Sequence, residues 1–492
     1  MKKFVIFLLI IGIFSRLYKV DSIPPHLSND EISIAYDAYS IAMSGKDEHG
    51  NPYPLSFPSY GTYKAPLYTY ILSPLVYIFG NTELVVRLPS IIAGLLTIVI
   101  IGLIAFELTK KRQIAMWSSA LLVITPWHIY ASRMAWEANL ALLFLSLGIY
   151  FLMKKNLWLS SIILVISMYA YHTEWLLVPL IMFAGGIIYF GKKVWKYWLV
   201  GFVLALPLLI DYLLNAGPGA RAKTEMIWSA EGANIFSILI EFIRNYAKYL
   251  NPKILFLNGL NILVKDNPFT PGLLLWPMIV PIFLGIKKIK NNFFWIWLLF
   301  SPVTAALTIG DFSLIRNLNT VVPLTILTAV GIGRINKIWW SLVLVVLINF
   351  GLIYFWHFPK ELGETFQGYR PIAHFLKSVE DSTNEIFVDY RYGNYRWGLG
   401  KEYSGIPYLY LAFFQKWDPS ITQNRIIKGG EIYFGKYMIG QIDWGKDIIR
   451  PNRYFVVSVG NPPEENVKDK LEQVATFDNA SGKMAFEVWR GK

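Results

Sequence analysis

Residues 85–109 read VVRLPSIIAGLLTIVIIGLIAFELT, a stretch of 25 positions in which apolar side chains predominate. An α-helix of about 20 apolar residues is long enough to cross the hydrocarbon core of a bilayer. Three basic residues, Lys110, Lys111 and Arg112, follow the stretch directly. Basic residues collect in the cytoplasmic loops of membrane proteins. The sequence therefore predicts a transmembrane helix here whose C-terminal end faces the cytoplasm.

The composition of the whole chain also indicates a membrane protein. Of its 492 residues, 54% are hydrophobic and 16% are charged, and the mean hydropathy of +0.42 is too high for one soluble domain. The absence of cysteine excludes disulfides, thiol catalysis and cysteine-ligated metals. The six histidines show no HxxxH or HExxH spacing, so no histidine-based metal site is predicted. The net charge of +13 arises largely from short basic clusters between apolar stretches, so nucleic acid is not an expected partner.

Basic clusters occur at every second connection between apolar stretches, beginning with Lys2 and Lys3. Placing them all in the cytoplasm gives eleven transmembrane helices, a cytoplasmic N-terminus and an external C-terminus. Residues 15–18, Ser-Arg-Leu-Tyr, are no signal-peptide cleavage site, so the first helix is expected to remain attached. We therefore expect an integral protein of the plasma (inner) membrane. The expected helices are residues 4–20, 85–109, 113–130, 137–153, 157–171, 174–191, 196–214, 271–286, 293–309, 318–333 and 338–356.

Two of the expected external loops are long, and each contains an apolar segment. The first loop, residues 21–84, includes a piece at 66–79 that is short for a span and is interpreted as an interfacial or re-entrant helix. The second loop, residues 215–270, includes apolar positions at helical spacing between 235 and 250. We expect this amphipathic stretch to lie flat on the bilayer.

From about residue 357 the composition changes to that of a soluble domain. Helix-like and strand-like segments alternate there, which is typical of an α/β fold. We therefore predict two domains, a transmembrane module at 1–356 and an external soluble α/β domain at 357–492. The segments are helix-like at 370–381 and 403–416, and strand-like at 385–390 and 453–459.

Asp30 and Glu31 are adjacent carboxylates in the first external loop, next to the expected membrane surface. Acids this close to a bilayer core are costly unless they are hydrated, paired or used. One of them can act as a general base toward a hydroxyl while the other orients the substrate or holds a cation. The alternative interpretation is structural, with Ser28 or Asn29 capping a helix and the two acids stabilising its first turn.

Four cations and one further acid lie on the same side of the membrane. Lys64 precedes an expected helix start, where it could bind a phosphate together with the helix N-terminus, or simply extend toward the membrane surface. Arg87 opens the second expected span on the external side, against the positive-inside preference. Arg133 and Glu137 are four residues apart, a spacing that also permits a structural ion pair. Arg316 is a further external cation.

His128, His172 and Glu174 also reach the external side, and we interpret them as packed or capping residues. Ionisable residues from many helices thus converge on one membrane face. This distribution indicates a site for a charged, membrane-borne substrate at the outer leaflet.

In these segments, over about residues 1–350, the chain resembles the GT-C glycosyltransferases, specifically the dolichyl-phosphate-mannose-protein mannosyltransferases and the lipid A aminoarabinosyltransferases. Ala65 stands where the family has a proline, and Glu137 where it has an aspartate, which leaves Glu137 a supporting role. The matching segments are Asp30-Glu31, Tyr63-Lys64-Ala65-Pro66-Leu67, the RLPSIIAG stretch at 87–94, Thr125-Pro126 through Arg133 and Glu137, and YLNPKILFLNG at 249–259.

The resemblance implies a GT-C fold and an inverting transfer of a hexose or pentose from a polyprenyl-phosphate donor. The acceptor would be a lipid, a glycan or a protein on the external face. Asp30 would deprotonate the acceptor hydroxyl, and Lys64, with Arg133 or Arg316, would hold the phosphate. Close relatives need no metal, although the Asp-Glu pair could hold a divalent cation, as in the oligosaccharyltransferase branch. No glycine-rich nucleotide-binding loop is apparent, in agreement with a lipid-linked donor.

Two alternatives to an enzyme stay open at this point. A transporter or lipid flippase would place charged residues in the middle of its spans. Few occur there, since Glu107 and Asp211 lie near helix ends. A non-catalytic scaffold that displays the C-terminal domain would not need the acids at 30 and 31.

Overall fold

The computed structural model describes residues 2–59, 62–215, 225–258, 272–310, 312–332, 337–361, 368–391, 406–447, 450–458, 461–479 and 482–492. The chain divides into two compact units. The first, called the helical unit here, comprises residues 1–20, 62–68 and 87–356. The second, called the mixed unit, comprises residues 21–61, 69–86 and 357–492.

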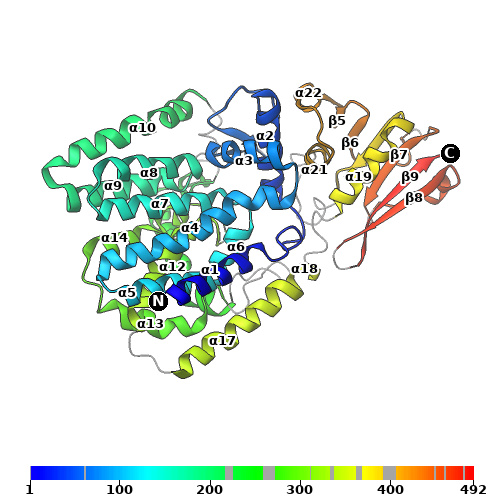
Figure 1. Cartoon of the computed structure of the whole chain (residues 1–492). Helices are drawn as coiled ribbons and strands as arrows, with labels where there is room; N and C mark the ends of the chain where they lie inside the picture. The colour runs from blue at the N-terminus through cyan, green and yellow to red at the C-terminus, as the bar shows by residue number, and fades with distance from the viewer. Residues whose placement is uncertain are drawn as a thin grey trace. The chain divides into compact units, whose positions relative to one another are not determined.

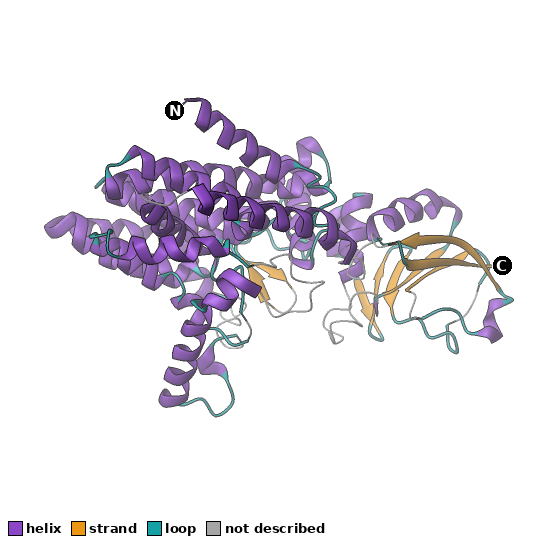
Figure 2. Cartoon of the chain, turned by 90° about the horizontal axis from the view of Figure 1, so that it is seen from below, coloured by secondary structure: helices purple, strands orange, loops and turns teal. Residues whose placement is uncertain are grey.

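Helices make up nearly all of the helical unit (Figures 1 and 2). They are α1 (Lys2–Leu17), α4 (Glu83–Thr109), α5 (Arg112–Ile124), α6 (Pro126–Arg133), α7 (Glu137–Met153), α8 (Leu157–Ala170), α9 (Glu174–Phe190), α10 (Val194–Leu214), α12 (Ile235–Tyr249), α13 (Ile279–Ile286), α14 (Asn292–Phe300), α15 (Val303–Ala306), α16 (Val321–Gly331) and α17 (Lys337–Leu352). Shorter turns of helix lie at Gly191–Lys193, Ile227–Ser229, Ile254–Asn258, Trp276–Met278, Leu318–Thr320 and Ile353–His357.

Helix occupies the greater part of each expected span. Within the described residues, three helices are long and apolar enough to cross a membrane: Glu83–Thr109, Glu174–Leu214 and Ile338–Lys360. The pair α5 and α6 forms a fourth if the two are taken as one broken span, and seven further apolar helices are shorter. Helices are therefore present where the sequence predicts them, and the number of eleven spans stays a prediction.

The largest departure from the expected helices is a break in the span predicted at 113–130. The helix ends at Ile124, restarts at Pro126 and bends by 62°. Proline cannot donate a backbone hydrogen bond, so carbonyls at the end of α5 need other donors. The fully buried Arg16 guanidinium supplies them, donating to Val123 O at 2.8 Å and to Leu122 O at 3.4 Å.

The packing of the helical unit suits a lipid environment. Gly148 lies where α7 meets α8, and a Cβ atom there would be 2.6 Å from the side chain of Leu164, so glycine permits the close approach. Elsewhere α10 exposes large apolar side chains, among them Phe202 at 59% and Leu213 at 70%. Large exposed apolar surfaces of this kind indicate contact with a membrane.

The mixed unit contains a twisted sheet with helices (Figure 1). Among the described residues, seven strands form this sheet in the order β4-β5-β6-β3-β7-β9-β8, with β3 parallel to both β6 and β7. The strands are β3 (Glu385–Asp389), β4 (Ile426–Lys428), β5 (Glu431–Phe434), β6 (Tyr437–Gly440), β7 (Arg453–Ser458), β8 (Leu471–Asp478) and β9 (Met484–Gly491). The helices of this C-terminal segment are α18 (Phe358–Glu361), α19 (Tyr369–Val379), α21 (Ile406–Gln415), α22 (Pro419–Gln423) and α23 (Glu465–Lys468), with a short turn at Glu380–Ser382.

The central strand β3 is buried on both faces. Phe387 on one face packs in a cluster with Phe455 and Trp444. On α19, Tyr369 stacks on Tyr410 of α21 and also contacts Phe486 of β9. The four segments predicted as helix or strand beyond residue 357 have that structure over most of their described residues, with Tyr390 and Lys416 lying in turns at the ends.

Most of the first expected loop, residues 21–84, packs within the mixed unit, although residues 62–68 belong to the helical unit. The loop contains α2 (Asn29–Ser44), β1 (Phe57–Ser59), β2 (Thr62–Lys64) and α3 (Pro66–Phe79). Residues 21–61 and 69–86 group with 357–492, although the predicted domain boundary after residue 356 separates them. The division into a transmembrane module and an external domain itself stays a prediction.

Candidate functional site

The adjacent acids Asp30 and Glu31 lie in the first turn of α2, and their side chains have different surroundings. Ser28 caps the helix, its Oγ accepting from Glu31 N at 3.4 Å, while Glu31 Oε2 accepts from Ser28 N at 2.9 Å. This reciprocal capping box satisfies two backbone donors at the helix start. Glu31 is fully buried, whereas Asp30 is exposed. The capped helix allowed by the sequence is therefore present, with Glu31 taking part in the cap and Asp30 exposed beside it.

Lys64 ends strand β2 in the helical unit, and Pro66 starts α3 two residues later. Its side chain is buried, with 5% of the residue exposed. The preceding residue, Tyr63, is attached to the start of α9, because His172 Nε2 lies 2.7 Å from Tyr63 O. The strand that ends in Lys64 is thus hydrogen-bonded to His172, which lines a cavity in the helical unit.

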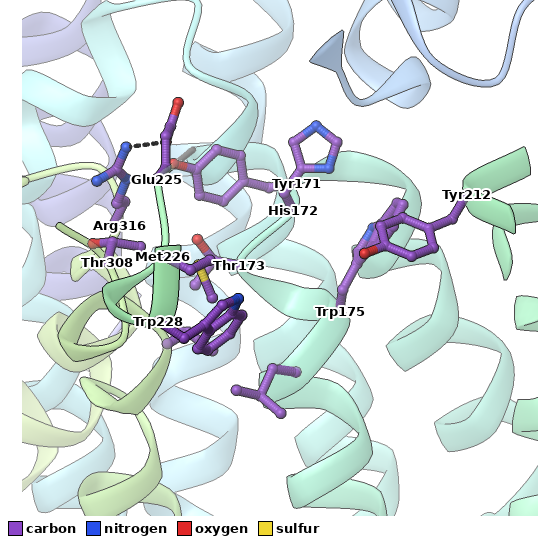
Figure 3. Close-up of a pocket in the computed structure, with 12 residues that line it drawn as sticks. Tyr171, His172, Thr173, Trp175, Tyr212, Glu225, Met226, Trp228, Thr308 and Arg316 are labelled. Carbon is purple, nitrogen blue, oxygen red and sulfur yellow. Dashed lines mark hydrogen bonds and ion pairs between the residues drawn. The ribbon is translucent and has the colours of Figure 1, made fainter. Parts of the chain in front are cut away.

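A cavity of about 320 Å³ lies within the helical unit near His172 (Figure 3). Aromatic rings form much of its wall, with Trp175 edge-on to both His172 and Tyr212 at centroid distances of 5.2 and 5.8 Å. Arg316 Nη2 bonds to Glu225 Oε2 at 2.6 Å at one side of the cavity. The lining residues are Tyr171, His172, Thr173, Trp175, Leu176, Tyr212, Glu225, Met226, Trp228, Thr304, Thr308 and Arg316.

The cavity has the properties of a ligand site. Concave sites are mostly apolar and carry a few polar groups that fix the orientation of the ligand. The Arg316 guanidinium and the Glu225 carboxylate are each about a quarter exposed, at 22% and 25% of the side chain. An anion that binds Arg316 must therefore share this cation with Glu225 or displace it.

Two other predicted cations are bonded to the last turn of α1 and the residues that follow it. Arg87 is fully buried and donates to Val20 O at 2.7 Å. Arg133, also fully buried, donates to Ser15 O at 3.0 Å and to Tyr18 O at 2.8 Å.

The last turn before residue 357 supplies a further partner for Arg133. The Nε of Arg133 donates to the Tyr354 hydroxyl at 3.2 Å, and the guanidinium lies 5.1 Å from the ring centre of Phe355. These contacts give Arg133 a role in joining three helical segments. Glu137 is the first residue of α7 and is half-buried.

Comparison with known proteins adds to this geometry. The sequence model of the dolichyl-phosphate-mannose-protein mannosyltransferase family matches residues 6–256. The chain belongs to this family. No curated protein sequence matches it significantly. As a member of the mannosyltransferase family, the chain is a membrane-integral glycosyltransferase, which favours the enzyme over the transporter and scaffold interpretations.

Two solved structures of the glycosyltransferase ArnT share the fold of this chain. ArnT from Cupriavidus metallidurans in the apo state has a TM-score of 0.57 and 11% identity, covering 99% of this chain and 96% of its own. The same protein bound to undecaprenyl phosphate has a TM-score of 0.58 and 11% identity, covering 99% and 97%. AglB from Archaeoglobus fulgidus has a TM-score of 0.46 and 11% identity, covering 80% and 62%.

Some residues that line the cavity were not predicted from the sequence as site residues. Glu225 and Trp228 lie in the long second loop, where no periodic pattern or motif marks them. His172 was interpreted as packed or capping, although it lines the cavity. Within the described part of the chain, no three His, Asp or Glu side chains form a group that could hold a metal. The metal requirement stays a prediction.

Proposed function

We propose that the chain transfers a sugar from a polyprenyl-phosphate donor to an acceptor hydroxyl at the external face of the plasma membrane, with inversion at the anomeric carbon. The observation that carries this proposal is the exposed Asp30 on a capped helix turn whose neighbour, Glu31, is already used by the cap. The resemblance of this segment to the mannosyltransferase family implies a catalytic aspartate in the first external loop, which supports the proposal.

The reaction is a single displacement. The Asp30 carboxylate removes the proton from the acceptor hydroxyl as the acceptor oxygen forms a bond to the anomeric carbon. The bond between that carbon and the phosphate oxygen breaks at the same time, and the polyprenyl phosphate leaves with the electron pair. A positioned general base contributes about 10²- to 10⁴-fold to such a step.

Lys64 is proposed to hold the phosphate that leaves. Negative charge grows on this phosphate during the displacement, so a fixed cation stabilises the transition state more than the ground state. The burial of Lys64 strengthens this effect, because a charge interaction is less screened away from water. The N-terminus of α3, which starts at Pro66, adds to the local positive potential.

The aromatic cavity is proposed to bind the donor, with Arg316 as a second contact for its phosphate. His172 links the cavity wall to the strand that ends in Lys64, which supports a shared ligand for the two cations. ArnT, whose fold this chain shares, has been crystallised with undecaprenyl phosphate. This supports a polyprenyl phosphate as the donor carrier here. The acceptor is proposed to be a lipid, glycan or protein, and no metal cofactor is expected.

The experiment is a transfer assay with purified protein in detergent or nanodiscs. Polyprenyl-phosphate hexoses and pentoses are offered in parallel with the corresponding nucleotide sugars, with and without EDTA. We expect transfer from a lipid-linked donor alone, insensitive to EDTA, and NMR of the product should show the anomeric configuration opposite to that of the donor. Transfer from a nucleotide sugar, or retention of configuration, would overturn the proposal.

A further inference from the structure

The helix that carries the acids is held by segments far along the chain. Within the mixed unit, α2 packs against α21 and α22, which are more than 360 residues away in sequence. The Tyr36 hydroxyl lies 3.2 Å from Thr422 Oγ1, and the Tyr39 hydroxyl donates to Lys416 O at 3.3 Å. The C-terminal segment thus contacts α2 through hydrogen bonds as well as apolar packing.

Tyr410 supplies a bond close to the acids in sequence. Its hydroxyl donates to the carbonyl oxygen of Leu27 at 2.6 Å, and both residues are 1% exposed. Leu27 directly precedes Ser28, the residue that caps α2 and fixes the turn of Asp30. The Tyr410 ring is itself held by stacking on Tyr369, at 4.8 Å and 15°. Tyr410 therefore fixes the backbone where the chain enters the acid-bearing turn.

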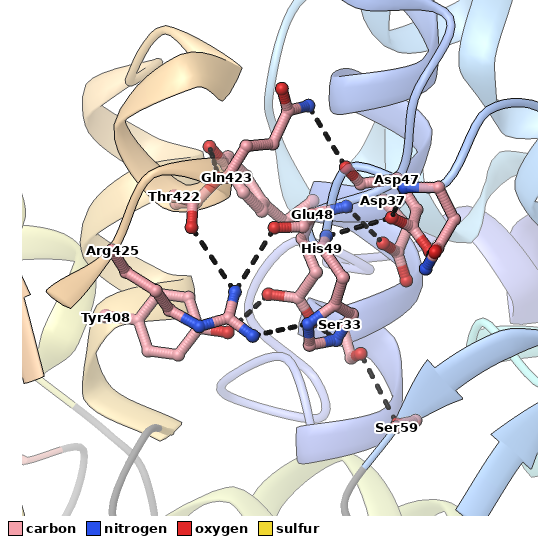
Figure 4. Close-up of polar contacts among 12 residues, drawn as sticks. Ser33, Asp37, Asp47, Glu48, His49, Ser59, Tyr408, Thr422, Gln423 and Arg425 are labelled. Carbon is pink, nitrogen blue, oxygen red and sulfur yellow. Dashed lines mark hydrogen bonds and ion pairs between the residues drawn. The ribbon is translucent and has the colours of Figure 1, made fainter. Parts of the chain in front are cut away.

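A second set of bonds holds the segment that follows the other end of α2 (Figure 4). Arg425 donates to Glu48 O at 3.3 Å and contacts His49 Nδ1, and the Tyr408 hydroxyl donates to the Glu48 carboxylate. Gln423 donates to Asp47 O at 3.1 Å. Because both ends of α2 are tied to the same C-terminal segment, the helix is constrained in position as well as in conformation.

We propose that Tyr410 is a positioning residue for Asp30, and that the C-terminal segment acts in catalysis by holding the acid-bearing helix in place. This inference rests on the proposed function, in which Asp30 is the general base. Tyr410 is buried, and its hydroxyl is already bonded to the backbone that precedes the acid-bearing turn. It acts through Leu27 and the cap at Ser28.

The loss of the Tyr410 hydroxyl is expected to affect the position of Asp30 for a physical reason. Removing the Tyr410 hydroxyl leaves the buried Leu27 carbonyl without this donor, while the capping box of Ser28 and Glu31 stays intact. The helix therefore persists, but its first turn is less firmly placed. A displacement of about 1 Å of a reacting group can lower a rate by about 100-fold.

The test compares Tyr410→Phe with Tyr437→Phe. Tyr437 is a matched control because its hydroxyl is also buried in the mixed unit, but it donates to Gln415 Oε1 at 2.9 Å, a partner that lies within the C-terminal segment itself. Both variants keep the ring and lose one oxygen. Transfer is measured with a polyprenyl-phosphate sugar at saturating concentration, and the number of donor-binding sites per protein corrects for any inactive fraction.

We expect Tyr410→Phe to lower kcat about 10- to 100-fold with donor KM unchanged within twofold, and Tyr437→Phe to keep kcat within twofold. Hydrogen exchange of the backbone amides at 28–33 should rise in Tyr410→Phe alone. In an Asp30→Asn background, Tyr410→Phe should have no further effect on the residual rate, because both changes remove the same contribution. A merely structural defect would lower that residual rate by the same factor as in the wild type.

The outcomes separate the inference from the function on which it rests. If Asp30→Asn keeps near-normal turnover, the proposed function fails. If Asp30→Asn is impaired but Tyr410→Phe behaves like Tyr437→Phe in rate and in hydrogen exchange, the positioning inference fails and the function stands. Independent, multiplicative losses in the double variant also overturn the positioning role.

Discussion

Replacing Glu225 by glutamine should tighten donor binding, an unusual result for a change inside a binding cavity. Glu225 Oε2 accepts from Arg316 Nη2 at 2.6 Å, so the carboxylate competes with any donor phosphate for the same guanidinium. Glutamine keeps the size of the side chain and removes its charge. Under the proposed function, Arg316 is then released toward the phosphate.

The size of the effect follows from the burial of the pair. Hydrogen bonds to charged groups contribute about 1.5–3 kcal/mol when buried, whereas exposed ion pairs contribute about 0.2–1 kcal/mol. Side chains that are 22% and 25% exposed fall between these cases, so we assign the pair about 1–2 kcal/mol. Since 1.4 kcal/mol is a factor of ten, the donor Kd should fall about five- to thirtyfold.

The assay is equilibrium binding of a polyprenyl-phosphate sugar to the wild type, Glu225→Gln and Glu241→Gln. Glu241 is the control because it pairs with Arg244 at 3.5 Å on α12 and does not line the cavity. Arg316→Gln should weaken binding. If Glu225→Gln and Glu241→Gln have equal Kd values, Arg316 does not bind the phosphate, and a weaker Kd in Glu225→Gln would show that the carboxylate itself contacts the donor.

Three further predictions concern topology, the phosphate and helix packing. Single cysteines at Lys111 and Lys288 should be labelled from the cytoplasm and those at Ala230 and Gly430 from outside, and external labelling at Lys111 would refute the topology. Lys64→Ala and Lys64→Gln should weaken donor binding and slow single turnover. Lys64→Arg should recover part of the loss because the positive charge is kept. Equal effects of all three changes would refute a role for the charge. Gly148→Ala should lower the free energy of unfolding by about 1–3 kcal/mol because its Cβ would lie 2.6 Å from Leu164. Thermal unfolding measures this against the control Gly351→Ala, whose Cβ would have nothing within 4 Å. Equal melting temperatures of the two variants would contradict the packing.

Local patterns predicted most of the helices. Apolar stretches and their flanking basic clusters are patterns among residues that are neighbours in the sequence, so they can be recognised without the structure. Helices lie where these patterns predict them. The break between α5 and α6 was missed, although Pro126 marks it. The strands β4, β5 and β6 span only three or four residues each, give little alternation and were not predicted, and the eight-residue strands β8 and β9 were not predicted either. Their pairing depends on contacts that local sequence does not encode.

The site was partly visible in the sequence. Ser28 and Glu31 have the spacing of a capping box, which is the signal that separates the role of Glu31 from that of Asp30. The bond from Tyr410 to Leu27 joins residues 383 positions apart, and no pattern in either segment indicates it. The grouping of the first loop with the C-terminal segment therefore required the structure.

The single-turnover rate of Asp30→Asn, compared with Glu31→Gln, tests the central claim most directly. We predict that Asp30→Asn lowers the rate by about 10²- to 10⁴-fold with unchanged donor affinity and an unchanged melting temperature, because an exposed general base is lost. Glu31→Gln should stay close to the wild type, because glutamine can complete the capping box. Near-normal turnover in Asp30→Asn, or loss of activity in Glu31→Gln alone, would contradict the assignment of Asp30 as the base.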